Sequence, residues 1–124
     1  MANLYLKLIE DAGRLPGSYR AMGTPPQTFV STQDGTSVTG WKICQFAYHE
    51  KKNGPRDWWS TDYSLCVDES GQLWELVLGW GYLEDDPRRK SDVVLSRVDG
   101  ERLRSWHVNN WDFGKMKRSV EAMI

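Results

Sequence analysis

Two neighbouring stretches and the turn between them decide the fold: WWSTDYSLCV (58–67), DESG (68–71) and QLWELVLGWGYL (72–83). Successive side chains of a strand point to opposite faces of a sheet. In the first stretch, the face running from Trp59 to Val67 is mostly apolar; in the second, the face running from Trp74 to Tyr82 is entirely apolar. Gly79 and Gly81 share the opposite face and indicate a bulge or a closely packed neighbour. We therefore predict two antiparallel strands joined by a short turn.

Further strands are expected before this pair. Residues 27–32 read as a short strand and residues 38–50 as a longer one. Asp34-Gly35 between them is a strong hairpin signal, because Gly readily adopts the positive φ that such turns require. The longer strand is apolar on both faces, which is typical of a central strand covered on both sides.

After the charged loop 84–91, residues 93–98 read as a fifth strand. Asp99-Gly100 then predicts a second tight hairpin, with a returning strand over 101–108. Residues 101–104 are also compatible with a helix, so the sheet is expected to have about five to six strands.

Helices are expected at both ends of the chain. Residues 3–13 place apolar side chains at helical spacing, with Asn3 as the cap and Gly13 as a left-handed terminus. Residues 16–27 are rich in Pro and Gly and are expected to form a long loop with a functional role. A terminal helix is predicted from Trp111 onward, capped by Asn109-Asn110.

The predicted fold class is therefore α+β: a bent antiparallel sheet with an N-terminal and a C-terminal helix, in a single domain over 1–124. With 40% hydrophobic and 27% charged residues, the composition excludes a disordered chain. The longest apolar run, residues 76–82, is too short to cross a membrane. The first residues lack the basic region of a signal peptide, so a cytoplasmic protein is expected.

The residue types that carry catalysis are sparse. Cys44 and Cys66 are the only cysteines, and we expect a reduced pair in or near the core. The two histidines, His49 and His107, show no metal-ligand spacing with them, so no metal site is expected. Phosphate-binding and nucleophile-elbow motifs are absent, so we expect no cofactor, and a non-enzymatic protein is favoured over an enzyme.

One enzymatic alternative stays open. Glu50-Lys51-Lys52 lies at the end of a predicted strand, with His49 beside it and Asp34 upstream. Carboxylates near a lysine are what a small metal-dependent nuclease or hydrolase uses. In a chain with 27% charged residues this pattern also arises by chance.

Charge is segregated along the chain. Residues 1–86 carry 7 Lys/Arg and 12 Asp/Glu, a net of −5, whereas residues 87–124 carry 9 and 5, a net of +4. The predicted 93–108 hairpin places Arg97, Arg102 and Arg104 on one face beside Trp106. Solvent, the acidic half of the chain or an anionic partner is expected to compensate these like charges. The last of these makes a nucleic-acid-binding module the second function class.

Tryptophan is over-represented, with seven residues in 124. Trp41, Trp59, Trp74 and Trp80 fall on faces expected to be core, which leaves Trp58, Trp106 and Trp111 for a binding surface. Tryptophan and arginine dominate the energetics of protein interfaces. We therefore expect a small non-enzymatic interaction protein of the inhibitor, immunity or adaptor type that binds a protein partner. The expected partner-binding residues are Trp58, Trp106, Trp111, Arg97, Arg102 and Arg104.

Overall fold

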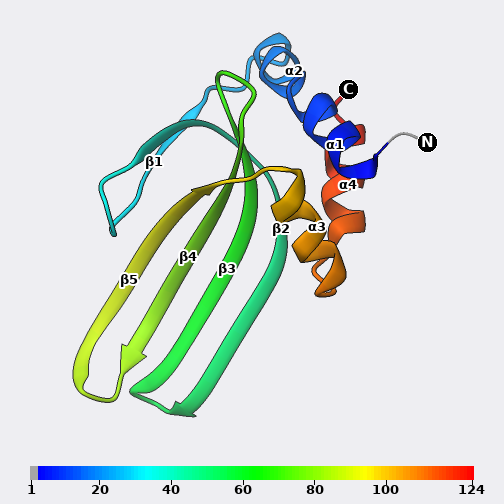
Figure 1. Cartoon of the computed structure of the whole chain (residues 1–124). Helices are drawn as coiled ribbons and strands as arrows, with labels where there is room; N and C mark the ends of the chain where they lie inside the picture. The colour runs from blue at the N-terminus through cyan, green and yellow to red at the C-terminus, as the bar shows by residue number, and fades with distance from the viewer. Residues whose placement is uncertain (1–2) are drawn as a thin grey trace.

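The computed structural model describes residues 3–124 and confirms the predicted α+β class. One antiparallel sheet has five strands in chain order, and four helices gather at one end of it (Figure 1). The strands are β1 (Gln27–Val30), β2 (Ser37–Gly54), β3 (Asp57–Asp68), β4 (Leu73–Leu83) and β5 (Asp86–Arg97). The helices are α1 (Leu4–Ala12), α2 (Leu15–Ala21), α3 (Gly100–Val108) and α4 (Phe113–Glu121). Within residues 3–124, no helix is both long enough and apolar enough to cross a membrane.

The N-terminal helix starts as predicted but does not end as predicted. The Asn3 side chain accepts a hydrogen bond from the Tyr5 amide at 2.9 Å, which caps α1. Gly13 is right-handed, with φ −61°, and the chain turns directly into α2. The loop expected over 16–27 is therefore wrong for residues 16–21, whereas residues 22–26 do connect α2 to β1 outside any helix or strand. Pro16 lies in the first turn of α2, where a missing amide proton costs no hydrogen bond.

The second hairpin, expected at Asp99-Gly100, is also wrong. The Asp99 side chain accepts a hydrogen bond from the Arg102 amide at 2.8 Å and caps α3. Leu103 and Trp106, three residues apart, are buried on one side of this helix. Residues 101–108 thus form a helix, which was the other structure compatible with residues 101–104.

Strands β2 and β5 are longer than predicted. β2 runs on to Gly54, and β5 already begins at Asp86, inside the expected charged loop. β2 pairs with β1 only over 37–40, so most of it is an edge strand rather than a central one. The last helix begins at Phe113, where Asp112, and not Asn109-Asn110, supplies the cap.

The two faces of the sheet carry separate apolar cores. On one face, which we call the helix face, the strands pack against the helices. Its buried residues are Leu8, Ala12, Leu15, Tyr19, Trp41, Phe46, Leu65, Val67, Leu73, Val98, Leu103, Trp106, Phe113, Met116 and Val120. The other face, which we call the inner face, has a smaller core of Val38, Cys66, Leu76 and Leu95, packed against Phe29, Trp74, Leu78 and Val93.

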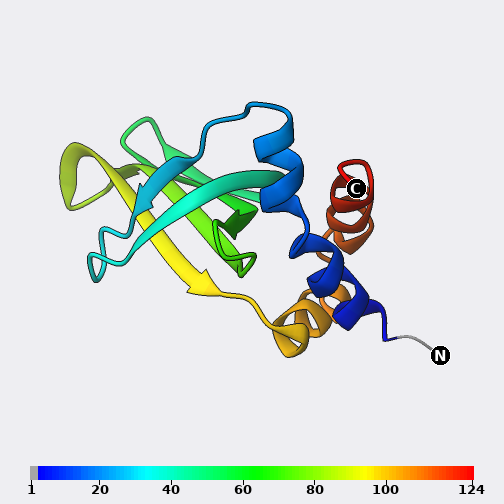
Figure 2. The same ribbon diagram turned by 90° about the horizontal axis from the view of Figure 1, so that it is seen from above.

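The sheet curls until its first and last strands approach each other. The Thr32 amide, just after β1, donates to the Val93 carbonyl at 2.9 Å, and the Val93 amide donates to Thr32 Oγ1 at 2.9 Å. Figure 2 shows β1 crossing toward β5 in this way. β-Bulges between Lys42 and Cys44 and between Gln45 and Ala47 help to bend β2. The inner face is therefore concave. We call the hydrogen-bonded contact between Thr32 and Val93 the seam, and it closes only one part of this face.

Candidate functional site

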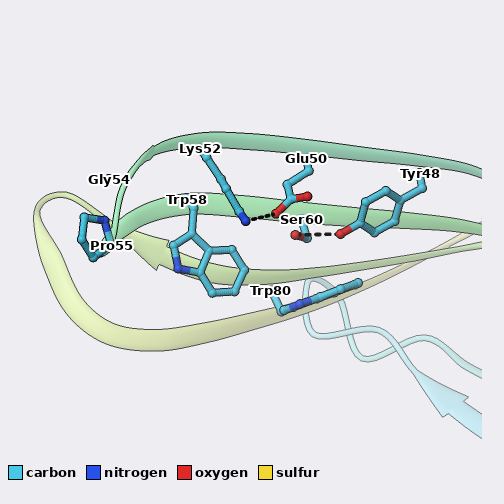
Figure 3. Close-up of a pocket in the computed structure, with 8 residues that line it drawn as sticks. All are labelled: Tyr48, Glu50, Lys52, Gly54, Pro55, Trp58, Ser60 and Trp80. Atoms are coloured by element: carbon cyan, nitrogen blue, oxygen red, sulfur yellow. Dashed lines mark hydrogen bonds and ion pairs between the residues drawn. The ribbon is translucent and has the colours of Figure 1, made fainter.

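A pocket of about 620 Å³ opens on the inner face, near the β2–β3 turn (Figure 3). The helices lie at the other end of the sheet (Figure 1). We call it the aromatic pocket. Its lining residues are Tyr48, Glu50, Lys52, Gly54, Pro55, Trp58, Ser60 and Trp80. A second pocket of about 340 Å³ lies beside Trp111 and is smaller. The aromatic pocket is thus where the curled sheet leaves its concave face unfilled.

Strand register builds this pocket. Glu50 of β2 lies opposite Ser60 of β3, and Ser60 lies opposite Trp80 of β4, so these three side chains share the inner face. In the next row, Trp58 lies between Lys52 and Tyr82. Because Ser60 is small and fully buried, it leaves a depression between larger neighbours.

The aromatic walls of the pocket belong to two separate ring contacts. Trp80 makes a tilted contact with Tyr48, at 6.2 Å between ring centroids. Trp58 instead contacts Tyr82 edge to face at 5.6 Å. Trp58 and Trp80 are both half-buried, and Tyr48 is 47% exposed. Three large rings therefore present surface to an incoming group.

Polar groups in the pocket are few. Tyr48 donates its hydroxyl proton to Ser60 Oγ at 3.1 Å, which fixes the tyrosine ring over the depression. The Lys52 ammonium lies 3.2 Å from Glu50 Oε1, and the two side chains are 71% and 37% exposed. An ion pair this exposed contributes little stability and is easily broken. The site therefore has apolar walls and one replaceable ion pair.

The three tryptophans expected at a binding surface have different locations. Trp58 lines the aromatic pocket, and no helix covers it. Trp106 is only 7% exposed and belongs to the helix-face core, which leaves little of it for a partner. Trp111 is half-buried and packs on Tyr63 at 4.7 Å between ring centroids.

The four tryptophans expected in the core also have different locations. Trp41 is buried, and Trp74 packs against the inner core. Trp59 and Trp80 belong to neither core, so assigning them to the core is wrong. Trp80 lines the pocket, while Trp59 covers Gly79 on the opposite face of the sheet. The close neighbour predicted from the glycines is therefore the Trp59 indole at Gly79, and the pairing of β4 with β5 has an irregularity at Gly81.

The arginines do not form one cluster, because the hairpin that would align them is a helix. Arg97, at the end of β5, stacks over Trp74 at 5.5 Å. Arg102 donates from Nη2 to Glu75 Oε1 at 2.7 Å and also stacks over Trp106. Arg104 is exposed elsewhere on α3. The expected single basic face beside Trp106 is thus wrong.

The Glu75–Arg102 pair joins the sheet to α3. Glu75 is 5% exposed, and its burial raises the pKa of the carboxyl although the Arg102 guanidinium opposes that shift. Internal pairing, one of the fates considered for these arginines, therefore applies to Arg102. Its partner, Glu75 of β4, lies in the acidic half of the chain.

The residues considered for nuclease or hydrolase chemistry are not brought together. Glu50 and Lys52 face the pocket, but His49 is on the opposite face, against Tyr63 and Trp111. Asp34 precedes β2, whereas Glu50 lies near its far end. Among residues 3–124, no group of three or more His, Cys, Asp or Glu could hold a metal ion.

Both cysteines are free thiols in apolar surroundings. Burial raises the pKa of Cys44, and it raises that of Cys66 to about 12. A raised thiol pKa is the opposite of what a cysteine nucleophile needs.

Sequence reasoning missed Tyr48 and Trp80 as pocket residues. The alternation of β4 groups Trp80 with the apolar face of that strand, and this grouping is correct. The missing information was the register, which places Trp80 opposite the small Ser60 rather than beneath a helix. Comparison with protein-family models, curated proteins and solved structures finds no match to this chain, so the site is interpreted from its own geometry.

Proposed function

We propose that this chain is a non-enzymatic binding protein, of the inhibitor, immunity or adaptor kind, that takes part of a protein partner into the aromatic pocket. The observation that carries the proposal is the arrangement of Trp58, Trp80 and Tyr48 around Ser60. All three rings offer surface, and the helices lie at the other end of the sheet.

Protein interfaces support this choice. Hot spots are enriched in Trp and Tyr that sit in well-packed pockets from which binding expels water. A pre-formed sheet also loses little conformational entropy when a partner docks. Trp58 and Trp80 stand on two hydrogen-bonded neighbouring strands, so their positions are largely set before binding.

The experiment uses two adjacent lysines on opposite faces of β2. A photo-crosslinking amino acid replaces Lys52, which lines the pocket, or Lys51, which lies opposite Trp59 on the other face. Both residues are exposed. In extract from the native cell, we expect a specific protein adduct from position 52 and little or none from position 51.

Adding Trp58→Ala to the position-52 crosslinker should abolish the adduct without unfolding the protein, as checked by circular dichroism. Equal adducts from positions 51 and 52, or an adduct that survives Trp58→Ala, would place the partner elsewhere. The absence of any adduct at position 52 would also overturn the proposal.

A further inference from the structure

We infer that the group received by the aromatic pocket is a cation: a lysine or arginine side chain of the protein partner. This inference rests on the proposed function and names the chemistry of the group that enters. It starts from the walls of the pocket. The faces of aromatic rings carry partial negative charge and attract cations, most strongly for Trp.

Glu50 supplies the second part of the argument. Its carboxylate lines the same pocket as Trp58, Trp80 and Tyr48, and it already pairs with an alkylammonium group, that of Lys52. Figure 3 shows the Lys52 side chain extending over the pocket to reach Glu50. The pocket thus combines aromatic rings with a carboxylate, which are groups that bind cations. Lys52 of the same chain already pairs with that carboxylate.

Lys52 is an easily displaced occupant. Its side chain is 71% exposed, and no stacking of its ammonium on Trp58 or Trp80 is present. A cation held between the rings would gain ring contacts that Lys52 does not make. An anion would instead have to take Lys52 away from Glu50 while lying against the negative faces of the rings.

The surrounding charge agrees with this choice. All lining residues fall within residues 1–86, the half of the chain with a net charge of −5 from 7 Lys/Arg and 12 Asp/Glu. On neighbouring β5, Arg88 and Lys90 share one carboxylate, that of Asp86, at 3.2 and 3.0 Å. The segment that supplies every lining residue is acidic overall, which favours a basic partner.

The test is an NMR titration with three amino-acid probes of similar size. They are the N-acetyl methylamides of lysine, norleucine and glutamate, which present a cation, a neutral chain and an anion. The readout is the indole N–H signals of Trp58 and Trp80, assigned with Trp58→Phe and Trp80→Phe. We expect the lysine probe to shift both signals in a saturable way, with an affinity at least fivefold above that of norleucine.

Substitutions in β2 should change the affinity for the lysine probe in opposite directions. Lys52→Met should tighten binding of the lysine probe severalfold, because it removes both the competing ammonium and its repulsion. Glu50→Gln should weaken binding at least fivefold. Lys51→Met, on the opposite face of the same strand, should leave the affinity unchanged and serves as the control for a general change in net charge.

Each contrary outcome has a definite meaning. Equal binding of norleucine and lysine would overturn the inference while leaving the aromatic docking site in place. Preference for glutamate, with loss of binding in Lys52→Met, would make the pocket an anion site. If no probe moves either indole signal, the inference fails, and the crosslinking experiment decides separately whether a partner docks there.

Discussion

The indole of Trp59 lies against Gly79 of the neighbouring strand so closely that a Cβ atom at position 79 would come within 2.7 Å of its Cζ2 atom. Gly81 allows a similar approach, because a Cβ atom there would come within 2.2 Å of the Trp58 carbonyl oxygen. β4 therefore lacks side chains at two positions of one face, where the Trp59 indole and the Trp58 carbonyl oxygen of β3 come close.

This packing predicts the effect of adding one methyl group at position 79. Gly79→Ala should destabilise the fold by about 1–2 kcal/mol, because the added methyl group forces the indole away from the sheet. Urea unfolding measures the loss. Gly17→Ala is the matched control: nothing lies within 4 Å of its added Cβ, and alanine favours the helix there, so this variant should be unchanged or slightly more stable. Equal effects in the two variants would contradict the packing argument.

Trp58 and Trp106 were both expected at the binding surface, but their replacement should destabilise the fold to different extents. Trp106 is buried in the helix-face core, so Trp106→Ala should cost about 3–5 kcal/mol of unfolding free energy. Trp58 lies outside both cores and is half-exposed, so Trp58→Ala should cost less than about 1.5 kcal/mol. Chemical denaturation of both variants tests this order, and a reversal would mean that Trp58 is a structural residue.

Cys66 should be chemically inert in the folded protein. At pH 8, a thiol with a pKa of about 12 is ionised in roughly one molecule in ten thousand, and burial of Cys66 also blocks the reagent. Ellman's reagent should therefore label Cys66 only after unfolding in guanidinium, with Cys66→Ala used to assign the signal. Cys44 packs with the helix-face core and Cys66 with the inner core, so a disulfide between them is not expected. Rapid labelling in native buffer would show that the inner core opens.

Glu75 should make stability depend on pH in a direction unusual for a carboxylate. Burial raises its pKa in the folded state, so between the unfolded value of about 4.3 and the higher folded value the native protein holds more protons than the unfolded chain. The contribution of Glu75 is therefore greatest below that window and falls as pH rises through it. Glu75→Gln lacks this titration, so its unfolding free energy should improve relative to wild type between pH 4 and pH 7. A constant difference between the two proteins would exclude a raised pKa.

Asp99 tests the helix that replaces the expected hairpin. Its carboxylate accepts a hydrogen bond from the Arg102 amide, so Asp99→Ala should lower the free energy of unfolding by about 1 kcal/mol. Asp99→Asn and Asp99→Ser can also cap a helix and should lower it less. Thermal unfolding compares the three variants. If all three lose the same stability, the capping interaction is not what holds the start of α3.

These cases show why some elements were predictable and others were not. The β3–β4 pair and the buried stripe of α4 follow from periodicity, which is local. Asp99-Gly100 suits both a hairpin turn and a helix start, and the burial of Leu103 and Trp106 against distant parts of the chain favours the helix. Alternation likewise groups Trp80 with apolar neighbours, but it does not tell which part of a face the helices cover.

The same distinction between local and distant contacts bears on how the sheet assembles. The hydrogen bonds between Thr32 and Val93 join positions 61 residues apart, whereas every neighbouring pair of strands is joined by a hairpin. Closing so long a loop is entropically costly, and contacts of this kind form slowly. We therefore expect the seam to close last during folding and to open first by fluctuation. Hydrogen exchange at the Val93 amide should then be faster than at amides of the β3–β4 ladder, because it reports the opening of the seam alone.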